Sequence, residues 1–168
     1  MLCLHRDRQG QGRDGGRPRL REAGRAAGEQ FDLVILDAFN GEYIPEHLMA
    51  REFLEEVKAL LSPHGILVAN TFSSSRLYDA ESATYSKVFG RFYNIRRSGT
   101  GNRVIVASMQ PLPGKETLAQ RARTLQSRLE RFGMDASEYP PLMDAGQDWS
   151  RKARILTDQY APVNLLNN

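Results

Sequence analysis

Residues 31–40 contain a short apolar run that stops abruptly at an acidic side chain, Asp37. Runs of this length and composition are typical of parallel strands that are buried on both faces. In open α/β sheets, ligands bind beyond the carboxyl ends of such strands. The sequence therefore predicts a strand over Phe31–Leu36 and places the Asp37 carboxylate at the sheet edge where a binding site is expected.

A second apolar strand is predicted over residues 66–72, and a helix over residues 50–61 connects it to the first. The apolar residues of this helix have helical spacing, with charges on the opposite face. Residues 62–65 have turn composition, so we expect them to end the helix. Strand, helix and strand with short links form a βαβ unit.

A weaker helix is predicted over residues 77–89, followed by a β-hairpin of two strands over 92–96 and 103–108. An amphipathic helix follows over residues 116–132. Its polar face has mixed charge, which argues against a membrane helix and favours packing in the core or at an interface. The apolar stripe of this helix comprises Leu118, Ala122, Leu125, Leu129 and Phe132.

The charge of the chain is concentrated at its amino-terminal end. Residues 1–30 hold seven Arg and four acidic residues, a net charge of +3, whereas the other residues hold 16 basic and 16 acidic residues. The globular part therefore lacks the net basic charge that nucleic-acid binding needs, and no nucleic-acid partner is expected. Six glycines in residues 1–30 favour a disordered or atypical leader, with disorder up to about residue 18, ahead of a domain over residues 31–168.

The remaining composition excludes several classes of protein. The chain has 168 residues, which suits one domain. It has no apolar run of about 18 residues and no signal-peptide pattern, so we expect no membrane partner and a cytoplasmic location. Cys3 is the single cysteine, and the three histidines lack ligand spacing, so no metal site is expected.

Three motifs stand within residues 31–108: FDLVILD at 31–37, REFLE at 51–55 and LSPHGILV at 61–68. In combination they resemble the spermidine synthase (polyamine aminopropyltransferase) family, and LTDQYAPV at 156–163 is similar to the carboxyl end of its bacterial members. The resemblance implies an α/β fold: a partial Rossmann-like, methyltransferase-type sheet of order β-α-β-α-β-β, with a closing hairpin and an added carboxyl-terminal helix. It also implies that the chain corresponds to the carboxyl-terminal half of such a domain.

The resemblance implies aminopropyl transfer from decarboxylated S-adenosylmethionine to a small-molecule amine, with no metal. By position, Asp37 matches the acid that takes a proton from the attacking amine. The resemblance assigns Asp14 and Ala38 to the nucleoside co-substrate, and Asn40 and Tyr43 to the amine.

Several departures from the family pattern affect this expectation. Asn40 lacks the charge that holds a polyamine, and Arg96 and Arg97 stand where the family carries a Tyr-Pro motif, which predicts a repulsive cationic lining. The family's first strand and the glycine-rich nucleoside loop after it have no counterpart here. Because that first strand would pair with the strand Phe31–Leu36, we expect the edge of Phe31–Leu36 to be unpaired, which invites a homodimer through that edge.

Two alternatives stay open beside an aminopropyltransferase. One is an S-adenosylmethionine-dependent methyltransferase of the same fold, which the missing polyamine-specific acid favours. The other is a non-catalytic remnant or interaction module whose exposed strand edge binds a partner.

Overall fold

The computed structural model of the chain describes residues 2–5, 30–37, 44 and 48–160. Its strands are β1 (Leu2–His5), β2 (Phe31–Leu36), β3 (Leu61–Phe72), β4 (Phe92–Arg96) and β5 (Asn102–Ser108). Its α-helices are α2 (Arg51–Ala59), α3 (Tyr78–Phe89) and α4 (Lys115–Glu130). Three short 3₁₀ helices complete the described elements: η2 (Ala136–Glu138), η3 (Pro140–Leu142) and η4 (Asp158–Tyr160).

The described strands form one sheet in the order β1-β2-β3-β5-β4. β2 and β3 are parallel neighbours, and α2 connects them along the chain. β5 is antiparallel to both β3 and β4. The predicted order of strands and helices after residue 31 is therefore confirmed, including the closing hairpin. Glycines with positive φ stand where the chain reverses, at Gly90 after α3 and Gly99 between β4 and β5.

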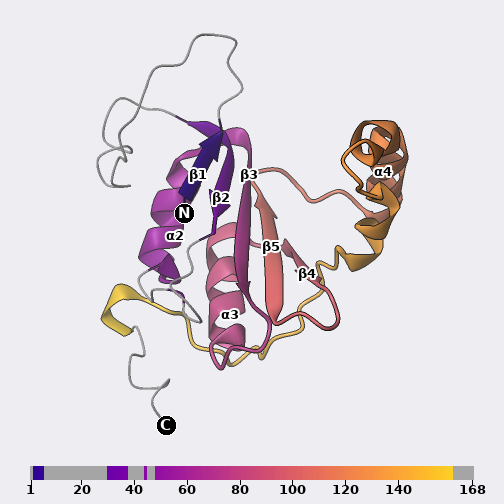
Figure 1. Ribbon diagram of the computed structural model, residues 1–168. Coiled ribbons are helices and arrows are strands. Elements are labelled where there is room, and N and C mark those ends of the chain that lie inside the picture. The colour runs from indigo at the N-terminus through magenta and orange to yellow at the C-terminus, as the bar shows by residue number, and fades with distance from the viewer. Residues whose placement is uncertain (1, 6–29, 38–43, 45–47, 161–168) are drawn as a thin grey trace.

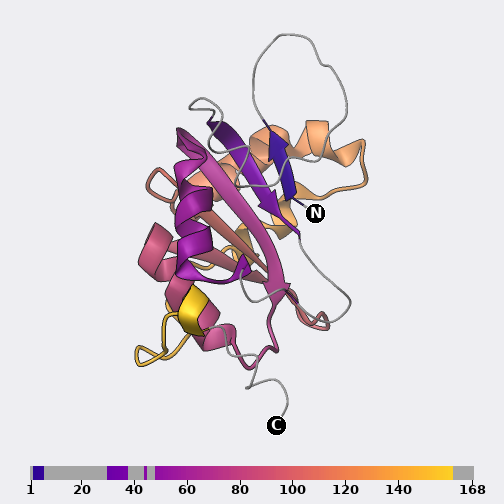
Figure 2. The ribbon, with the colours of Figure 1, turned by 90° about the vertical axis from the view of Figure 1, so that its left-hand side faces the viewer.

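Burial alternates along every central strand with a period of two residues. The first face of the sheet is covered by α2 and α3, which lie on the same side of it (Figures 1 and 2). The core forms there from Val34, Leu54, Val57, Leu67, Ile105, Ala107 and their neighbours. The opposite, second face carries half-buried aliphatic residues between these positions. Burial on both faces was predicted. The structure shows full burial along β2, β3 and β5 on the first face, whereas on the second face Tyr93 of β4 is buried and its neighbours on β5, β3 and β2 stay partly exposed.

The edge of β2 beside β1 differs from the prediction. Leu2 to His5 pair antiparallel with β2, so that Leu2 lies opposite Leu36 and His5 opposite Leu33. The expectation of an unpaired β2 edge is therefore wrong, because four residues of the predicted leader add a strand there. The rest of the predicted leader, apart from Gln30, lies outside the described residues. Because β1 occupies the β2 edge, the reason for expecting a homodimer through an unpaired edge no longer holds.

Residues 62–65 were predicted as a turn, and they lie instead within β3. Phe31 pairs with Leu61, and Leu33 pairs with Ile66. An advance of two residues along β2 therefore corresponds to an advance of five residues along β3. The segment is thus an extended bulge. The residues that were interpreted as a turn form this irregular part of β3. α2 ends before them, at Ala59.

The amphipathic helix α4 lies to the side of the sheet, beyond β4 (Figure 1). It has no buried residue, and Leu125 and Phe132 of its stripe are exposed. The apolar stripe of α4 therefore does not pack in the core. α4 contacts η2 and η3 instead. Within the described part of the chain, no helix is long and apolar enough to cross a membrane.

Candidate functional site

Asp37 directly follows β2, at the edge where the parallel strands β2 and β3 both end. Its carboxylate is exposed, and Asn70 on β3 donates a hydrogen bond from Nδ2 to Oδ1 at 3.2 Å. The register explains the contact, because Leu36 pairs with Ala69 and the next residues are therefore neighbours. The structure thus brings the predicted acid and an amide together at the carboxyl edge of the sheet.

The other predicted site residues, Asp14, Ala38, Asn40 and Tyr43, lie outside the described residues. Their assignments to the nucleoside and the amine remain predictions. Of the predicted site, the described geometry therefore covers the candidate acid alone.

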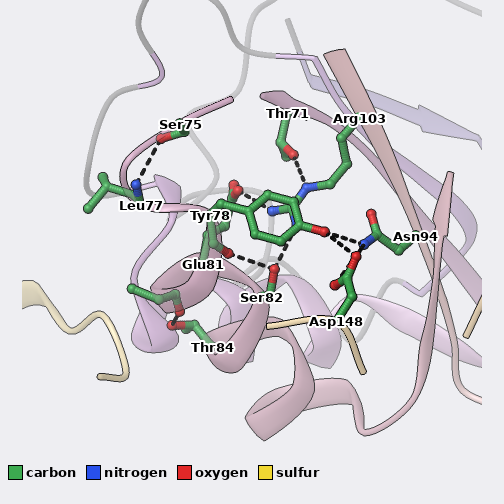
Figure 3. A network of polar contacts seen from close by, with 11 residues as sticks. Thr71, Ser75, Leu77, Tyr78, Glu81, Ser82, Thr84, Asn94, Arg103 and Asp148 are labelled. Carbon is green, nitrogen blue, oxygen red and sulfur yellow. Dashed lines mark hydrogen bonds and ion pairs between the residues drawn. The ribbon is translucent and has the colours of Figure 1, made fainter. Parts of the chain in front are cut away.

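Beside this edge, a buried polar network fixes the carboxyl end of β3 (Figure 3). Arg103 on β5 is fully buried and lies opposite Thr71 in the sheet. Its Nε donates to Thr71 Oγ1 at 2.9 Å, its Nη1 donates to Ser82 Oγ at 2.6 Å, and its Nη2 pairs with the Glu81 carboxylate. The guanidinium therefore ties the end of β3 to α3.

The carboxylate of Glu81 is almost fully buried in the same network. Burial raises the pKa of Glu81, and the adjacent Arg103 guanidinium opposes this rise. Removal of one partner of such a pair strongly lowers stability, because the remaining charge is then buried in the protein interior without compensation.

Tyr78, at the start of α3, joins this network to the carboxyl-terminal segment (Figure 3). Its ring centroid lies 4.1 Å from the Arg103 guanidinium carbon. Its hydroxyl donates to Asp148 Oδ2 at 2.7 Å and accepts from Asn94 Nδ2 at 2.6 Å. Burial, and then the hydrogen bond to Asp148, raise the pKa of Tyr78. The helix was predicted to begin at residue 77, one residue before the start of α3.

The two arginines expected to form a cationic lining both have acidic partners. Arg96 pairs with Asp148 at 2.7 Å, and Arg97 pairs with Glu138 at 3.3 Å. The predicted lining is therefore not a patch of uncompensated positive charge. Both carboxylates come from the segment after α4.

The carboxyl-terminal segment also fastens both helices of the first face. Arg51 N donates to Leu156 O at 2.9 Å, and Leu156 N donates to Thr84 Oγ1 at 2.9 Å. Leu156 is buried beside Met49 and Leu77. The motif that begins at Leu156 therefore has a structural role here, holding the start of α2 against α3.

Sequence reasoning missed Asn70, Arg103, Glu81 and Asp148. For Arg103 a signal was present: Ile105 and Ala107 face the core, and alternation puts Arg103 on the same face. Asn70 could not be found this way, since its contact with Asp37 depends on the register of two strands.

One further feature lies away from Asp37. An apolar groove of about 680 Å³ runs between α4 and the short helices η2 and η3, lined by Ala119, Ala122 and Pro140 among others. Among the residues whose placement is described, no three His, Cys, Asp or Glu side chains gather as metal ligands would.

No family model matches the chain. The polyamine aminopropyltransferase of Vibrio vulnificus (strain CMCP6) is 56% identical over 140 residues, which are 83% of this chain and 47% of that enzyme. The probable spermidine synthase from Corynebacterium glutamicum ATCC 13032 superposes with a TM-score of 0.52 at 20% identity, over 80% of this chain and 54% of that one. Human methyltransferase-like protein 13, in a complex with SAH, superposes with a TM-score of 0.52 at 23% identity, over 77% and 57% of the two chains.

The two solved structures share the fold of this chain. The identity to the Vibrio vulnificus enzyme is much higher than the identity to either solved structure. The chain spans about half the length of the curated relatives it matches. The predicted Rossmann-like, methyltransferase-type fold is therefore confirmed.

Proposed function

Since this chain is a homologue of the polyamine aminopropyltransferase family that covers part of such an enzyme, we propose that it supplies the acid-bearing half of an aminopropyl-transfer site. The observation that carries this proposal is the position of Asp37, at the carboxyl edge of β2 with its Oδ1 bonded to Asn70. A carboxylate at this edge, on a strand of matching sequence, suits general-base chemistry on an amine.

An alkylammonium is mostly protonated at neutral pH, since its pKa is about 10, as for lysine. The Asp37 carboxylate binds the ammonium and accepts a proton as the nitrogen becomes nucleophilic. The nitrogen then attacks the aminopropyl carbon next to sulfur in decarboxylated S-adenosylmethionine. The new C–N bond forms as the C–S bond breaks, and the sulfur leaves with its electron pair as the thioether methylthioadenosine.

The hydrogen bond from Asn70 orients the Asp37 carboxylate for this step. A carboxylate that is already held in place loses less conformational freedom when the amine binds, which favours the alignment of the reacting groups. Asp14 and Ala38 belong to the proposed nucleoside site, and Asn40 and Tyr43 belong to the proposed amine site. The proposed setting is the cytoplasm.

Calorimetry with methylthioadenosine, S-adenosylmethionine and its decarboxylated form tests this proposal. We expect binding of methylthioadenosine and the decarboxylated form, followed by turnover when putrescine is added. Binding of S-adenosylmethionine with no response to putrescine indicates a methyltransferase instead. Absence of binding by all three compounds indicates a non-catalytic role for the chain on its own.

Asp37→Asn tests the role of the acid. Loss of the proton acceptor should lower turnover by roughly 10²- to 10⁴-fold. Asp32→Asn is the matched control, because Asp32 lies near the other end of the same strand, about 17 Å away along β2. It accepts a hydrogen bond from Ser62 Oγ at 2.6 Å and should retain turnover. Equal turnover in both variants would remove Asp37 from the mechanism.

A further inference from the structure

Exposed apolar side chains are concentrated around α4, outside the sheet. Of the five large hydrophobic residues that are exposed in the described part of the chain, four lie within residues 125–139. The most exposed is Phe132, which keeps 64% of its surface accessible. The other three are Leu125, Met134 and Tyr139. Exposed apolar residues that gather in one region of a folded domain mark an interaction surface.

The apolar groove between α4, η2 and η3 lies in this region, and we call it the α4 groove. Its wall on α4 consists of residues from one side of the helix: Lys115, Ala119, Ala122, Arg123 and Gln126. The small alanine side chains leave space beside the prolines that begin η3. The resulting volume of about 680 Å³ is large enough for several side chains of a partner.

Contacts at the rim hold the α4 groove in shape. Gln126 Oε1 accepts a hydrogen bond from Ala136 N at 2.8 Å, which fixes η2 against α4. Asp135 Oδ1 accepts from Ser137 N at 2.9 Å and from Ser137 Oγ at 2.7 Å, so this carboxylate at the rim is already engaged. A partner therefore meets a preformed groove, which lowers the entropy cost of binding.

The positive charge of α4 has no ion-pair compensation. Residues 115–131 hold five basic and two acidic side chains. Arginines elsewhere, such as Arg96 and Arg103, have carboxylate partners, whereas no basic side chain of α4 forms an ion pair within the described residues. Lys115 and Arg123 line the α4 groove itself. Such a rim favours carboxylates on whatever enters the groove.

The apolar floor and the basic rim together select one kind of occupant. A flat bilayer does not reach apolar side chains that are recessed between helices. Nucleic acid would find no aromatic side chain for base stacking in the described lining. A second copy would bring the same basic helix against its own. A polypeptide segment with apolar side chains flanked by Asp or Glu matches both the floor and the rim.

We propose that the α4 groove binds an acidic amphipathic segment of a partner protein. Apolar side chains of this segment enter between α4 and η3, and its carboxylates pair with Lys115 and Arg123. The groove is separate from the candidate site, because Asp37 follows β2 whereas α4 lies beyond β4, near the other end of the sheet (Figure 1). The interaction is therefore additional to the proposed transfer chemistry.

Fluorescence anisotropy with the full chain and synthetic peptides tests this proposal. The probe is a labelled peptide of about 15 residues, with leucines at helical spacing and glutamates beside them. One matched peptide carries lysine in place of every glutamate, and another carries alanine in place of every leucine. We expect the probe to bind with a micromolar Kd and each matched peptide to bind roughly tenfold more weakly or worse.

Lys115→Glu combined with Arg123→Glu reverses the charge of the rim and should weaken binding of the probe roughly tenfold or more. The matched control combines Arg128→Glu with Lys152→Glu, which changes the net charge equally at exposed residues outside the groove lining. It should bind the probe nearly as the unaltered chain does. Ala122→Leu fills the floor without changing charge and should also weaken binding. Circular dichroism checks that each variant folds.

Equal weakening by the groove pair and the control pair overturns the proposal, because overall charge alone would then explain binding. Absence of probe binding, or equal binding of all three peptides, also overturns it. Binding of phosphatidylserine vesicles or of single-stranded RNA in place of the probe assigns the surface to another partner. A dimer in sedimentation analysis that the groove pair dissociates assigns the groove to a second copy. None of these measurements uses turnover, so their outcome is independent of the test of Asp37.

Discussion

On the face of the sheet toward α2 and α3, Ile105 and Leu67 are fully buried, whereas Ile66 on the opposite face keeps 39% of its surface exposed. The residue types on the two faces are nevertheless similar, since both are mostly aliphatic along the central strands. The faces differ in what covers them. The strands thus have the composition of a sheet buried on both sides, while the described helices close only one side.

The comparison teaches that strand composition reflects the complete domain in which a sheet is buried. A polar second face would indicate a two-layer protein open to water, as in many antiparallel sheets. The aliphatic second face is instead typical of a sheet that has helices on both sides. Four predictions test the contrast between the faces, in order of decreasing effect.

The largest effect is expected for Arg103→Met on the first face. This change leaves the buried Glu81 carboxylate without its guanidinium partner, which should lower the free energy of unfolding by about 3–5 kcal/mol. Urea denaturation measures the change. The double variant Arg103→Met, Glu81→Leu serves as the control and should recover most of the loss, because it removes both charges. A loss below 1 kcal/mol in the single variant would show that water reaches the first face.

The second prediction compares identical substitutions on opposite faces. Ile105→Ala removes side-chain atoms from the closed core and should cost about 2–5 kcal/mol of unfolding free energy. Ile66→Ala removes the same atoms from the open face, where little burial is lost, and should cost less than about 1 kcal/mol. Both are measured by urea denaturation of the chain alone. Equal costs would mean that the second face is already covered.

The contrast also explains which parts of the molecule could be predicted. The bounds of β2 and β4, and the start of α3 to within one residue, followed from hydrophobic pattern, because local periodicity reports which residues are buried. The position of Asp37 at the strand end followed in the same way. Its contact with Asn70 could not, because it joins residues 33 apart through the register of two strands.

Three further differences from the prediction concern β1, the α4 stripe and Gly65. β1 was not predicted because its four residues form a strand only by pairing with β2, across 25 intervening residues. The stripe of α4 was correctly predicted as amphipathic, yet amphipathicity does not say what the stripe contacts. The glycine at residue 65 was interpreted as a turn signal, although it serves a bulge within β3.

The third prediction concerns this bulge, which sets which side chains of β3 face the helices. A Cβ added at Gly65 would lie 2.9 Å from Leu61 Cβ and 3.0 Å from Phe31 O. Gly65→Ala should therefore cost about 1–3 kcal/mol of unfolding free energy through overpacking. Gly114→Ala is the control, since a Cβ there meets nothing within 4 Å. Equal melting temperatures of the two variants would contradict close packing at the bulge.

The fourth prediction uses the pH dependence of stability to test whether water is excluded from the first face. Burial raises the pKa of Glu81, and in Arg103→Met the guanidinium no longer opposes the rise. The folded state then binds a proton more tightly than the unfolded state. Stability is accordingly highest below the unfolded pKa and falls as pH rises through the folded pKa, by at most about 1.4 kcal/mol per pH unit.

Arg103→Met should therefore recover part of its lost stability as the pH is lowered toward 4, relative to Arg103→Met, Glu81→Gln measured in the same buffers. The Gln variant lacks the titrating carboxyl, so the difference between the two curves isolates Glu81 from the other acidic residues. Parallel curves would mean that Glu81 stays ionised and hydrated once its partner is removed. The first face would then be as accessible to water as the second, and the distinction between a closed and an open face of the sheet would fail.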